Sequence, residues 1–233
     1  MADVFLSYSR KDKTFVERVH ASLAADGRDV WVDWEDIPLT ADWWGEICSG
    51  IEAANTFIFV ISPDSVSSPV CNMEIDHATR HNKRLVPIVR IPADEKAMLA
   101  NLTQRELDDG IRKMLAGREL AVVAKENWLA LARHNWLFFK DDVEFTTNYA
   151  QLLKAIDTDL EYVRDHTRLT LRAREWEIKT RNNSFLLRGD DLLNAEAWLT
   201  HAVGKEPAPT PLHAEYIAES RQAENARQQE ALE

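Results

Sequence analysis

Glu74 is the residue of this sequence whose surroundings most suggest a chemical role. It lies in "SPDSVSSPVCNMEIDHA" (62–78), where a Ser-Pro-Asp turn follows an apolar run and a helix is predicted to begin near Ser68. The glutamate comes about one and a half turns into that helix, between two apolar residues. It is either a solvated charge near the positive end of the helix or a preorganised carboxylate that stabilises positive charge on a substrate.

Two histidines and a cysteine share this predicted helix. His77 and His81 have i, i+4 spacing and could bind a metal ion together, but a metal site needs a third ligand. The neighbouring sequence supplies none, so we interpret the pair as a solvated face and expect no metal. Cys71 has no His or Asn spaced to activate it, so we expect it to pack. Cys48 is the only other cysteine, which indicates reduced thiols and not a disulfide framework.

Alternating strands and helices must position these residues. Short apolar runs typical of buried strands occupy 3–7, 29–33, 56–62, 84–90 and 136–139. Besides the helix that carries Glu74, helical spacing occupies 11–27, 42–54 and 145–163. This alternation predicts an α/β fold in which helices cover both faces of a parallel sheet. Residues 93–131 predict two or three helices inserted between the fourth and fifth strands.

A sheet of this kind binds ligands at the carboxyl ends of its strands, here segments 7–12, 33–44 and 62–69. No G-x-G-x-x-G or G-x-x-x-x-G-K-[ST] motif occurs, which excludes a Rossmann or P-loop phosphate site. The first segment also lacks a glycine that would let its backbone approach a flavin phosphate. A phospho-acceptor site could use Asp64 and Lys140, but "SYSRKD" lacks the adjacent acidic pair that such a site needs.

The composition excludes other classes of protein. The chain has 28 basic and 39 acidic residues and a net charge of −11, which argues against binding to nucleic-acid phosphates. A hydrophobic content of 45% in 233 residues is ample for a folded core. No apolar run approaches the roughly 20 residues of a membrane span, and the N-terminus does not resemble a secretory signal. We therefore expect a cytoplasmic protein.

Three segments together resemble the Toll/interleukin-receptor (TIR) domain family: "VFLSYSRKD", "VWVDWEDIPLTADWWGEICSGIEAANTFIFVISPDSVSSPVCNMEI" and "KRLVPIVR". The resemblance is close over residues 1 to about 91 and resumes at "NWLFF", so that 93–131 is a local insertion. It implies a flavodoxin-like, five-stranded parallel sheet. The TIR domain would occupy 1–162, and a helical appendage would occupy 163–233.

Many TIR domains hydrolyse NAD+ at the nicotinamide–ribose bond, with a glutamate in a pattern like W-C-x-x-E. The resemblance assigns that glutamate to Glu74 and the cysteine to Cys71, with Val70 in place of the tryptophan. It implies NAD+ as a substrate and no cofactor. Nicotinamide is a good leaving group because it is already cationic in NAD+. Its loss builds positive charge on the ribose, which a single carboxylate can stabilise without a general acid.

The resemblance also implies a nucleotide pocket at the ends of the first two strands. Three positions that border it in the family are Tyr8, Ser9 and Arg10. Arg10 either pairs with the diphosphate or is a solvated loop residue. Trp34 and Trp43 flank "EDIPLTAD", the segment that the family calls the BB loop, and Asp33 directly precedes Trp34. The tryptophans either stack on nicotinamide or adenine or, for Trp43, anchor the next helix in the core.

From Arg164 the predicted strands stop and helices follow. "RLTLRAREWEIKT" and "DDLLNAEAWLTHAV" predict an amphipathic pair that must pack. A proline-rich joint at 205–211 then precedes a polar helix with little to bury. Residues 164 to about 218 resemble the segment that follows TIR domains in bacterial multidomain proteins. We therefore expect a further domain or sensor beyond Glu233.

The resemblance implies a TIR-domain NAD+ hydrolase of bacterial defence or signalling, activated when TIR domains self-associate. In that family the BB loop of one domain completes the site of its neighbour, and Trp34 and Ile37 are suited to such a contact. An alternative is a non-catalytic scaffold that acts only through TIR–TIR assembly. A third possibility is an enzyme that also uses Glu74 but releases cyclised ADP-ribose in place of the linear product.

Overall fold

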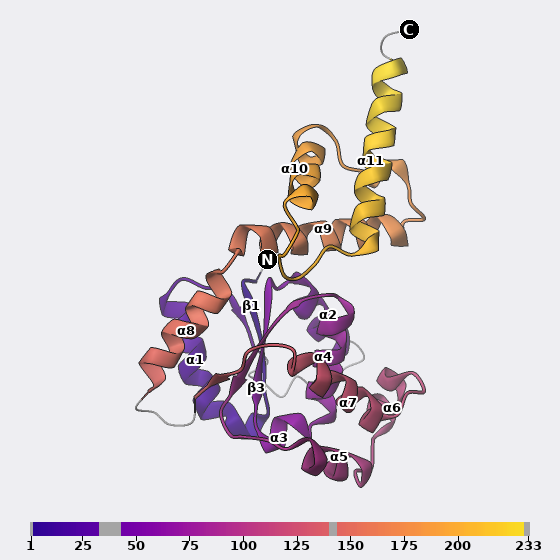
Figure 1. The fold of residues 1–233 in the computed structure, drawn as a ribbon. Coiled ribbons are helices and arrows are strands. Elements are labelled where there is room, and N and C mark those ends of the chain that lie inside the picture. Colours follow the sequence, from indigo (N-terminus) through magenta and orange to yellow (C-terminus); the bar gives the residue numbers. More distant parts are fainter. Residues whose placement is uncertain (1, 33–42, 140–143, 231–233) are drawn as a thin grey trace. The chain divides into compact units, whose positions relative to one another are not determined.

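The computed structural model describes residues 2–32, 43–139 and 144–230, and the chain divides into two compact units (Figure 1). The first unit is Met1–Thr158 and the second is Asp159–Glu233. The helix expected over 145–163 is two helices, α8 (Phe145–Asp157) and α9 (Leu160–Ile178). They separate because Thr158 is extended and Asp159 has a left-handed φ of 51°. No helix among the described residues is long and apolar enough to cross a membrane.

Five strands of the described residues form one parallel sheet. They are β1 (Val4–Ser7), β2 (Val30–Trp31), β3 (Thr56–Ile61), β4 (Arg84–Val89) and β5 (Leu137–Phe138). Their order, β2-β1-β3-β4-β5, confirms the predicted flavodoxin-like sheet. β1 pairs with β3 so that Ser7 lies opposite Phe59. The carboxyl ends of these two central strands therefore lie side by side.

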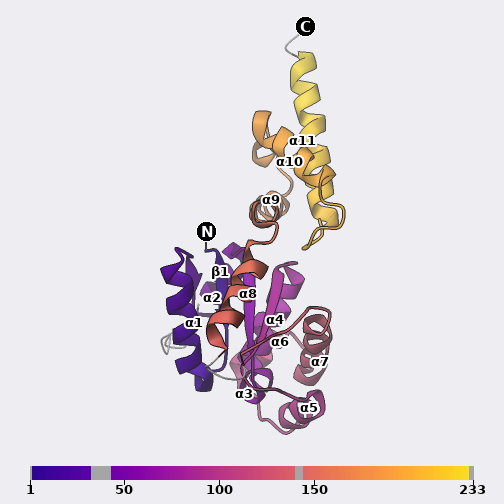
Figure 2. The same ribbon diagram turned by 60° about the vertical axis from the view of Figure 1, so that its left-hand side comes forward.

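Helices cover both faces of the sheet, as the alternating pattern predicts (Figures 1 and 2). One face carries α1 (Lys13–Ala25) and α8. The other carries α2 (Trp43–Ala53), α4 (Pro69–Arg80), α5 (Glu95–Thr103), α6 (Asp109–Leu115) and α7 (Leu120–Leu131). β3 is buried throughout and apolar after Thr56, because successive residues face opposite layers: Phe57 packs on the α2 side and Ile58 on the α1 side. The insertion 93–131, all of it described, forms three helices, α5, α6 and α7.

Serine caps start two helices in succession after β3. The Ser62 hydroxyl accepts a hydrogen bond from the Ser65 N–H and caps α3 (Pro63–Val66). The Ser68 hydroxyl accepts from the Cys71 N–H and caps α4. A proline follows each capping serine, at the position where a helix does not need the N–H that proline lacks. These caps set where α4 begins, and with it the turn on which Glu74 lies.

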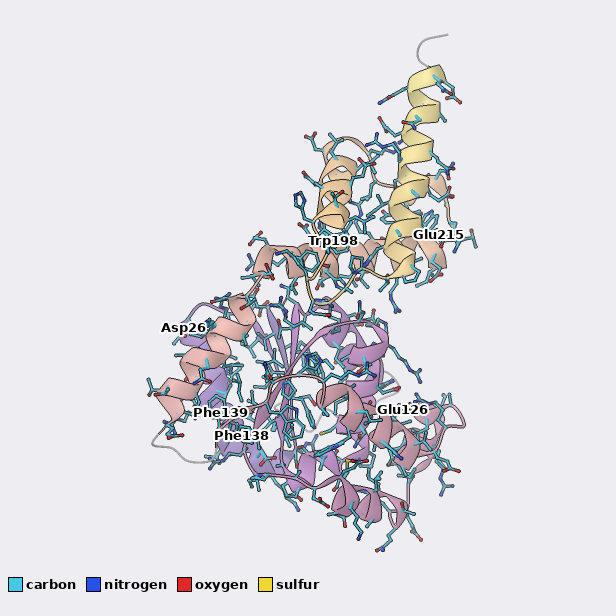
Figure 3. All side chains as sticks on the ribbon, viewed as in Figure 1. Asp26, Glu126, Phe138, Phe139, Trp198 and Glu215 are labelled. Carbon is cyan, nitrogen blue, oxygen red and sulfur yellow. The ribbon has the colours of Figure 1, made fainter. Side chains whose placement is uncertain are left out.

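The second unit has a hydrophobic core of its own, built by α9, α10 (Gly189–Thr200) and α11 (Pro211–Glu230). The predicted amphipathic pair contributes the buried side chains Leu169, Trp176, Leu192 and Trp198, the last of which is labelled in Figure 3. Leu193, also expected to pack, is 55% exposed. The expectation that the last helix has little to bury is wrong for its first half. There Tyr216 is fully buried and donates to the Phe185 carbonyl at 2.7 Å.

α2 packs closely on β2 at Gly50, where the helix meets the side chain of Trp31. A Cβ at this position would lie 2.9 Å from Cε2 of Trp31, whose indole stacks on Phe5 with 4.5 Å between centroids. We predict that Gly50→Ala lowers the free energy of unfolding by about 1–2 kcal/mol. The added methyl group overpacks the core, which costs about 1–3 kcal/mol. This cost outweighs the roughly 0.5–1 kcal/mol by which alanine stabilises a helix relative to glycine.

Urea unfolding followed by circular dichroism measures this change. The matched control is Ser49→Ala at the exposed neighbouring position, which should stay within about 0.5 kcal/mol of the parent chain. A Gly50→Ala chain as stable as the Ser49→Ala chain would show that Trp31 moves aside without loss.

Candidate active site

Glu74 is buried, with 6% of its surface exposed, so the reading as a solvated surface charge is wrong. One of its carboxylate oxygens accepts a hydrogen bond of 2.5 Å from the hydroxyl of Ser7, the last residue of β1. Glu74 is the sixth residue of α4 and lies beyond the first turn, where the helix dipole acts most strongly. A charge-assisted hydrogen bond from the sheet therefore holds this carboxylate.

A cavity of about 1090 Å³ opens at the carboxyl end of β1 and has Ser7 and Glu74 in its wall. Its volume lies slightly above the roughly 300–1,000 Å³ of ligand pockets, which leaves room for a dinucleotide-sized ligand. The wall also contains Phe5, Leu6, Tyr8, Ser9, Arg10, Lys11, Trp31, Trp43, Asp64, Ser68, Val70, Cys71, Arg105, Asp108, Gly110, Ile111 and Met114.

Part of the wall is aromatic and apolar. Trp31 stacks on Phe5, and Trp43 makes an edge contact with Trp44 at 5.8 Å between ring centroids. Val70 is partly buried and packs on the core of the α2 side, so an aliphatic surface replaces the tryptophan of the family pattern. Flat aromatic surfaces of this kind suit a planar ring in a ligand.

The mouth of the cavity carries charges of both signs. Arg10, Lys11 and Arg105 are exposed there. Lys11 pairs with Asp64 at 2.6 Å, and the Arg105 guanidinium donates to the Ser67 carbonyl at 3.1 Å. Because these cations come from the turn after β1 and from the insertion, an anionic group that enters the cavity would meet arginine from two sides.

Cys71 lies between Glu74 and the turn after β1. Its thiol donates to the Tyr8 carbonyl at 3.3 Å. Burial, and next the charge of Glu74, raise the pKa of the Cys71 thiol far above its usual range. A thiol that stays protonated is a poor nucleophile, so this cysteine ties α4 to β1 by packing and a hydrogen bond.

Asp12 is a further buried carboxyl group, 8% exposed, that the sequence reasoning missed. It accepts a hydrogen bond of 2.6 Å from the Ser62 hydroxyl, and burial raises the pKa of the Asp12 carboxyl above its ordinary value. This bond joins the turn after β1 to the cap of α3 and positions both. The available signal was an acidic residue at the end of "SYSRKD", directly after a buried strand.

The structure brings together most of the residues singled out from the sequence. Those that line the cavity are Tyr8, Ser9, Arg10, Trp43, Val70, Cys71 and Glu74. Trp43 packs on the core, as one of its two expected roles requires, and it also lines the cavity, while its stacking on a ligand ring stays a prediction. Asp33, Trp34 and Lys140 lie outside the described residues.

Sequence reasoning missed Ser7 and the contribution of the insertion. α6 supplies Ile111 and Met114 to the cavity wall. In α7, the side-chain amide of Asn127 donates to the backbone carbonyl of Asn72 at 2.8 Å and fixes α7 against α4. α6 and the segment before it are therefore part of the site, and α7 fastens the insertion to α4.

His77 and His81 do not form the solvated face expected of them. His81 is 8% exposed, and a carboxylate oxygen of Glu52 lies 2.9 Å from Nε2 of His77 and 3.2 Å from Nε2 of His81. The expectation was wrong because the third group comes from α2, which the fold packs against α4.

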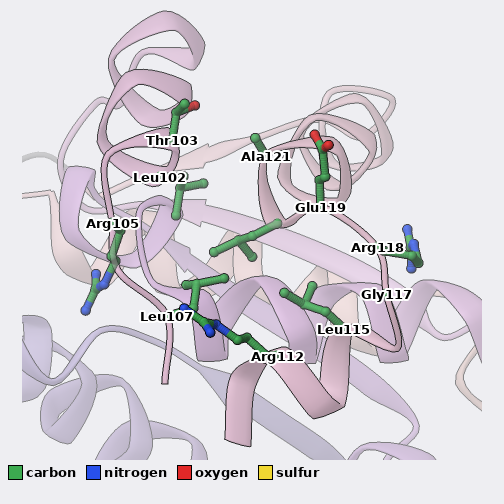
Figure 4. Close-up of a pocket in the computed structure, with 11 residues that line it drawn as sticks. Leu102, Thr103, Arg105, Leu107, Arg112, Leu115, Gly117, Arg118, Glu119 and Ala121 are labelled. Atoms are coloured by element: carbon green, nitrogen blue, oxygen red, sulfur yellow. The ribbon is translucent and has the colours of Figure 1, made fainter. Parts of the chain in front are cut away.

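A smaller hollow of about 380 Å³ lies among the inserted helices (Figure 4). Its wall includes Leu102, Leu107 and Leu115, and Arg118 at its edge pairs with Asp76 of α4 at 2.8 Å. That arginine fastens the insertion to α4. The larger cavity, which contains the held carboxylate, is therefore the candidate active site.

Comparisons with known proteins agree with this fold. Residues 4–119 match the family model of the TIR domain, and no curated protein matches the sequence significantly. One similar solved structure is that of the TIR domains of the activated Roq1 resistosome directly recognizing the pathogen effector XopQ. It has 18% identity and a TM-score of 0.53, covering 66% of this chain and 98% of that chain. Another is the TIR domain of the Toll-related receptor TRR-2 from Hydra magnipapillata, with 19% identity, a TM-score of 0.43 and coverage of 67% and 98%.

At such identities the Roq1 structure supports the fold alone, whereas the family model matches the sequence itself. The family model matches residues of the first unit, whose sheet has the strand order that the resemblance implies. Through this unit, the chain belongs to the TIR-domain family.

Proposed function

We propose that this TIR domain hydrolyses NAD+ at the bond between nicotinamide and ribose. Glu74 is the residue that stabilises the charge developing on the ribose. The observation that carries the proposal is the buried Glu74 carboxylate, held by the Ser7 hydroxyl at 2.5 Å in the wall of a dinucleotide-sized cavity. NAD+ is the substrate in this reaction, which needs no other cofactor.

The chemistry explains why one carboxylate is sufficient. The nicotinamide nitrogen takes the electrons of the breaking C–N bond and leaves as a neutral molecule, so no general acid is required. The ribose carbon then carries an oxocarbenium-like positive charge. Water adds to that carbon and loses a proton, and the products are nicotinamide, ADP-ribose and H+. A carboxylate already fixed beside the ribose stabilises the cation without having to reorganise during the reaction.

The rest of the cavity supplies groups for the other parts of NAD+. Arg10 and Arg105, exposed at the mouth, would pair with the diphosphate. Trp43 offers an aromatic face for nicotinamide or adenine, and Val70 an apolar surface. Of the expected contacts, Asp33 and Trp34 remain part of the proposal on the family resemblance alone.

A non-catalytic scaffold is the second candidate function. Val70 in place of the family tryptophan favours it, as do the apolar residues Val122 and Leu129, which are 49% and 53% exposed on α7 and could serve assembly. We further propose that the catalytic form also self-associates through its TIR domain, as the family resemblance implies. In this proposal the protein acts in the cytoplasm in a bacterial defence or signalling pathway. The appendage of 163–233 connects it to a further domain or sensor.

Replacing the carboxylate by an amide tests its charge. We predict that Glu74→Gln lowers NAD+ turnover about 100–1000-fold, because the amide keeps the shape and an acceptor for Ser7 but not the charge. Chromatography of nicotinamide and of the ribose product at high protein concentration measures turnover and separates linear from cyclised ADP-ribose.

The matched control is Glu46→Gln, an exposed carboxylate of α2, which should keep the parent rate. Full activity in a folded Glu74→Gln chain would remove Glu74 from the mechanism. A parent chain that is inactive at every concentration would favour the scaffold.

Removing the group that holds the carboxylate should have a smaller effect. We predict that Ser7→Ala lowers kcat by roughly 10–100-fold, since a hydrogen bond to a charged group is worth about 1.5–3 kcal/mol. Ser7→Thr keeps the hydroxyl and should recover most of that loss. Equal rates for Ser7→Ala and the parent chain would show that the bond does not position Glu74 in the reaction.

Assembly can be tested by complementation. If the loop of one TIR domain completes the site of its neighbour, specific activity should rise with protein concentration, and Trp34→Ala should lower it. Adding inactive Glu74→Gln chains to dilute parent chains should also raise activity, because they supply intact loops. Specific activity that stays constant over about two decades of concentration, together with a monomeric scattering mass, contradicts assembly.

A further inference from the structure

A cluster of ligand-type side chains lies one turn beyond Glu74 on α4. It consists of Glu52 from α2, His77 from α4 and His81, the residue that caps the C-terminus of α4, and the ligand atoms of the three all lie within 4.8 Å of one another. Glu52 Oε1 is 2.9 Å from His77 Nε2 and 3.2 Å from His81 Nε2. Among the described residues this is the group whose geometry fits a metal ion.

The spacing on α4 directs both imidazoles towards α2. His77 and His81 are i, i+4 neighbours whose rings stack with 3.9 Å between centroids and 29° between planes. α2 and α4 pack side by side (Figures 1 and 2), and the Lys83 ammonium donates to the Glu52 carbonyl at 2.9 Å, close to the end of α2. The three side chains are thus held by two packed helices of one unit.

The hydrogen bonds of His81 leave a place for a cation. Its Nδ1 lies 2.8 Å from the backbone carbonyl of His77, which can only accept, so Nδ1 carries the proton. A neutral ring has a single N–H, and the lone pair of Nε2 therefore faces the Glu52 oxygen. Two lone pairs that face each other repel unless a proton or a metal ion lies between them.

His77 has a similar arrangement. Its Nε2 faces Glu52, whereas its Nδ1 lies 3.6 Å from the thiol sulfur of Cys48, one turn before Glu52 on α2. The sulfur thus contacts the ring nitrogen that faces away from Glu52 and orients the ring, as the outer hydrogen bonds of metal-bound histidines do.

We propose that Glu52, His77 and His81 form a three-ligand Zn²⁺ site with an open fourth position. Imidazole nitrogens with one carboxylate favour zinc, whereas Mg²⁺ and Ca²⁺ prefer oxygen ligands throughout. Bonds to zinc of about 2.0–2.2 Å place tetrahedral ligand atoms about 3.3–3.6 Å apart, so the two separations from Glu52 Oε1, 2.9 and 3.2 Å, need to widen by at most about 0.7 Å.

The surroundings of the cluster suit an ion that enters from solvent. The side chains of Glu52, His77 and His81 are 30%, 18% and 9% exposed, so the site is shielded but reachable. A bound ion would clamp α2 to α4 and stabilise the first unit, whether or not this unit hydrolyses NAD+.

The rival explanation is a hydrogen-bonded cluster in which only protons lie between the imidazoles and Glu52. Titration of the untagged, chelator-treated full chain with Zn²⁺ alone separates the two. We expect saturable 1:1 binding, and a rise in Tm of roughly 5–10 °C at a free Zn²⁺ concentration about 100 times Kd. Mg²⁺ at the same concentration should leave Tm unchanged.

Four variants locate the ion. Glu52→Gln and His81→Gln should weaken Zn²⁺ binding at least about 100-fold, because each removes a ligand but keeps a hydrogen-bonding side chain. Cys48→Ala, which removes only the group beside His77, should weaken it by about 10–100-fold. His134→Gln is the control at an exposed histidine of the same unit and should bind like the parent chain.

Equal Zn²⁺ affinity in the parent, Glu52→Gln and His81→Gln chains overturns the proposal, as does a parent chain whose Tm does not respond to Zn²⁺. If a ligand variant fails to fold, the titration of the parent chain and of Cys48→Ala still decides the question. The readouts contain no NAD+, so this site and the proposed hydrolase activity can fail independently.

Discussion

The hydrogen bond between Ser7 and Glu74 is the constraint on which the first unit depends. A carboxylate with 6% exposure is strongly disfavoured unless polar partners replace the water that it has lost. Ser7 supplies such a partner from the end of β1, at 2.5 Å. Strand and helix must therefore keep one relative position, and the cavity wall forms where they meet. The same contact that stabilises the buried charge also leaves the carboxylate facing a space large enough for a ligand.

Two other hydrogen bonds near this one also join elements that are far apart in the sequence. The Asp12 carboxyl accepts from the Ser62 hydroxyl at 2.6 Å, and the Cys71 thiol donates to the Tyr8 carbonyl at 3.3 Å. Each joins the turn after β1 to the helices that follow β3. In a low-dielectric setting, such bonds are strong when made and costly when broken, so together they define one arrangement of the turns. A preorganised site needs this rigidity, because electrostatic stabilisation of a transition state is lost when the charged group can move away.

α4 is the element that connects the different parts of the site. Its residues point in three directions: Cys71 and Glu74 towards β1, Asp76 towards the insertion, and His77, together with the C-cap residue His81, towards α2. Most of these side chains are polar yet buried, and each is matched by a partner on another element. A helix with so many buried polar groups is specified by its neighbours more than by an apolar face. The candidate hydrolase site and the proposed zinc site therefore share one support.

The sequence by itself determined the sheet and the position of the key glutamate. Apolar runs and helical spacing act between near neighbours along the chain, and the motifs around Tyr8 and Glu74 follow the strands that they were expected to follow. Only the tertiary structure decided which groups meet across the chain. Ser7 with Glu74, Asp12 with Ser62, and Glu52 with the two histidines are pairs from different elements, as are the insertion and α4. The spacing of apolar residues along the chain does not predict such pairs, because they arise from how helices pack on a sheet. The break at Asp159 likewise depends on a single left-handed residue that helical spacing does not reveal.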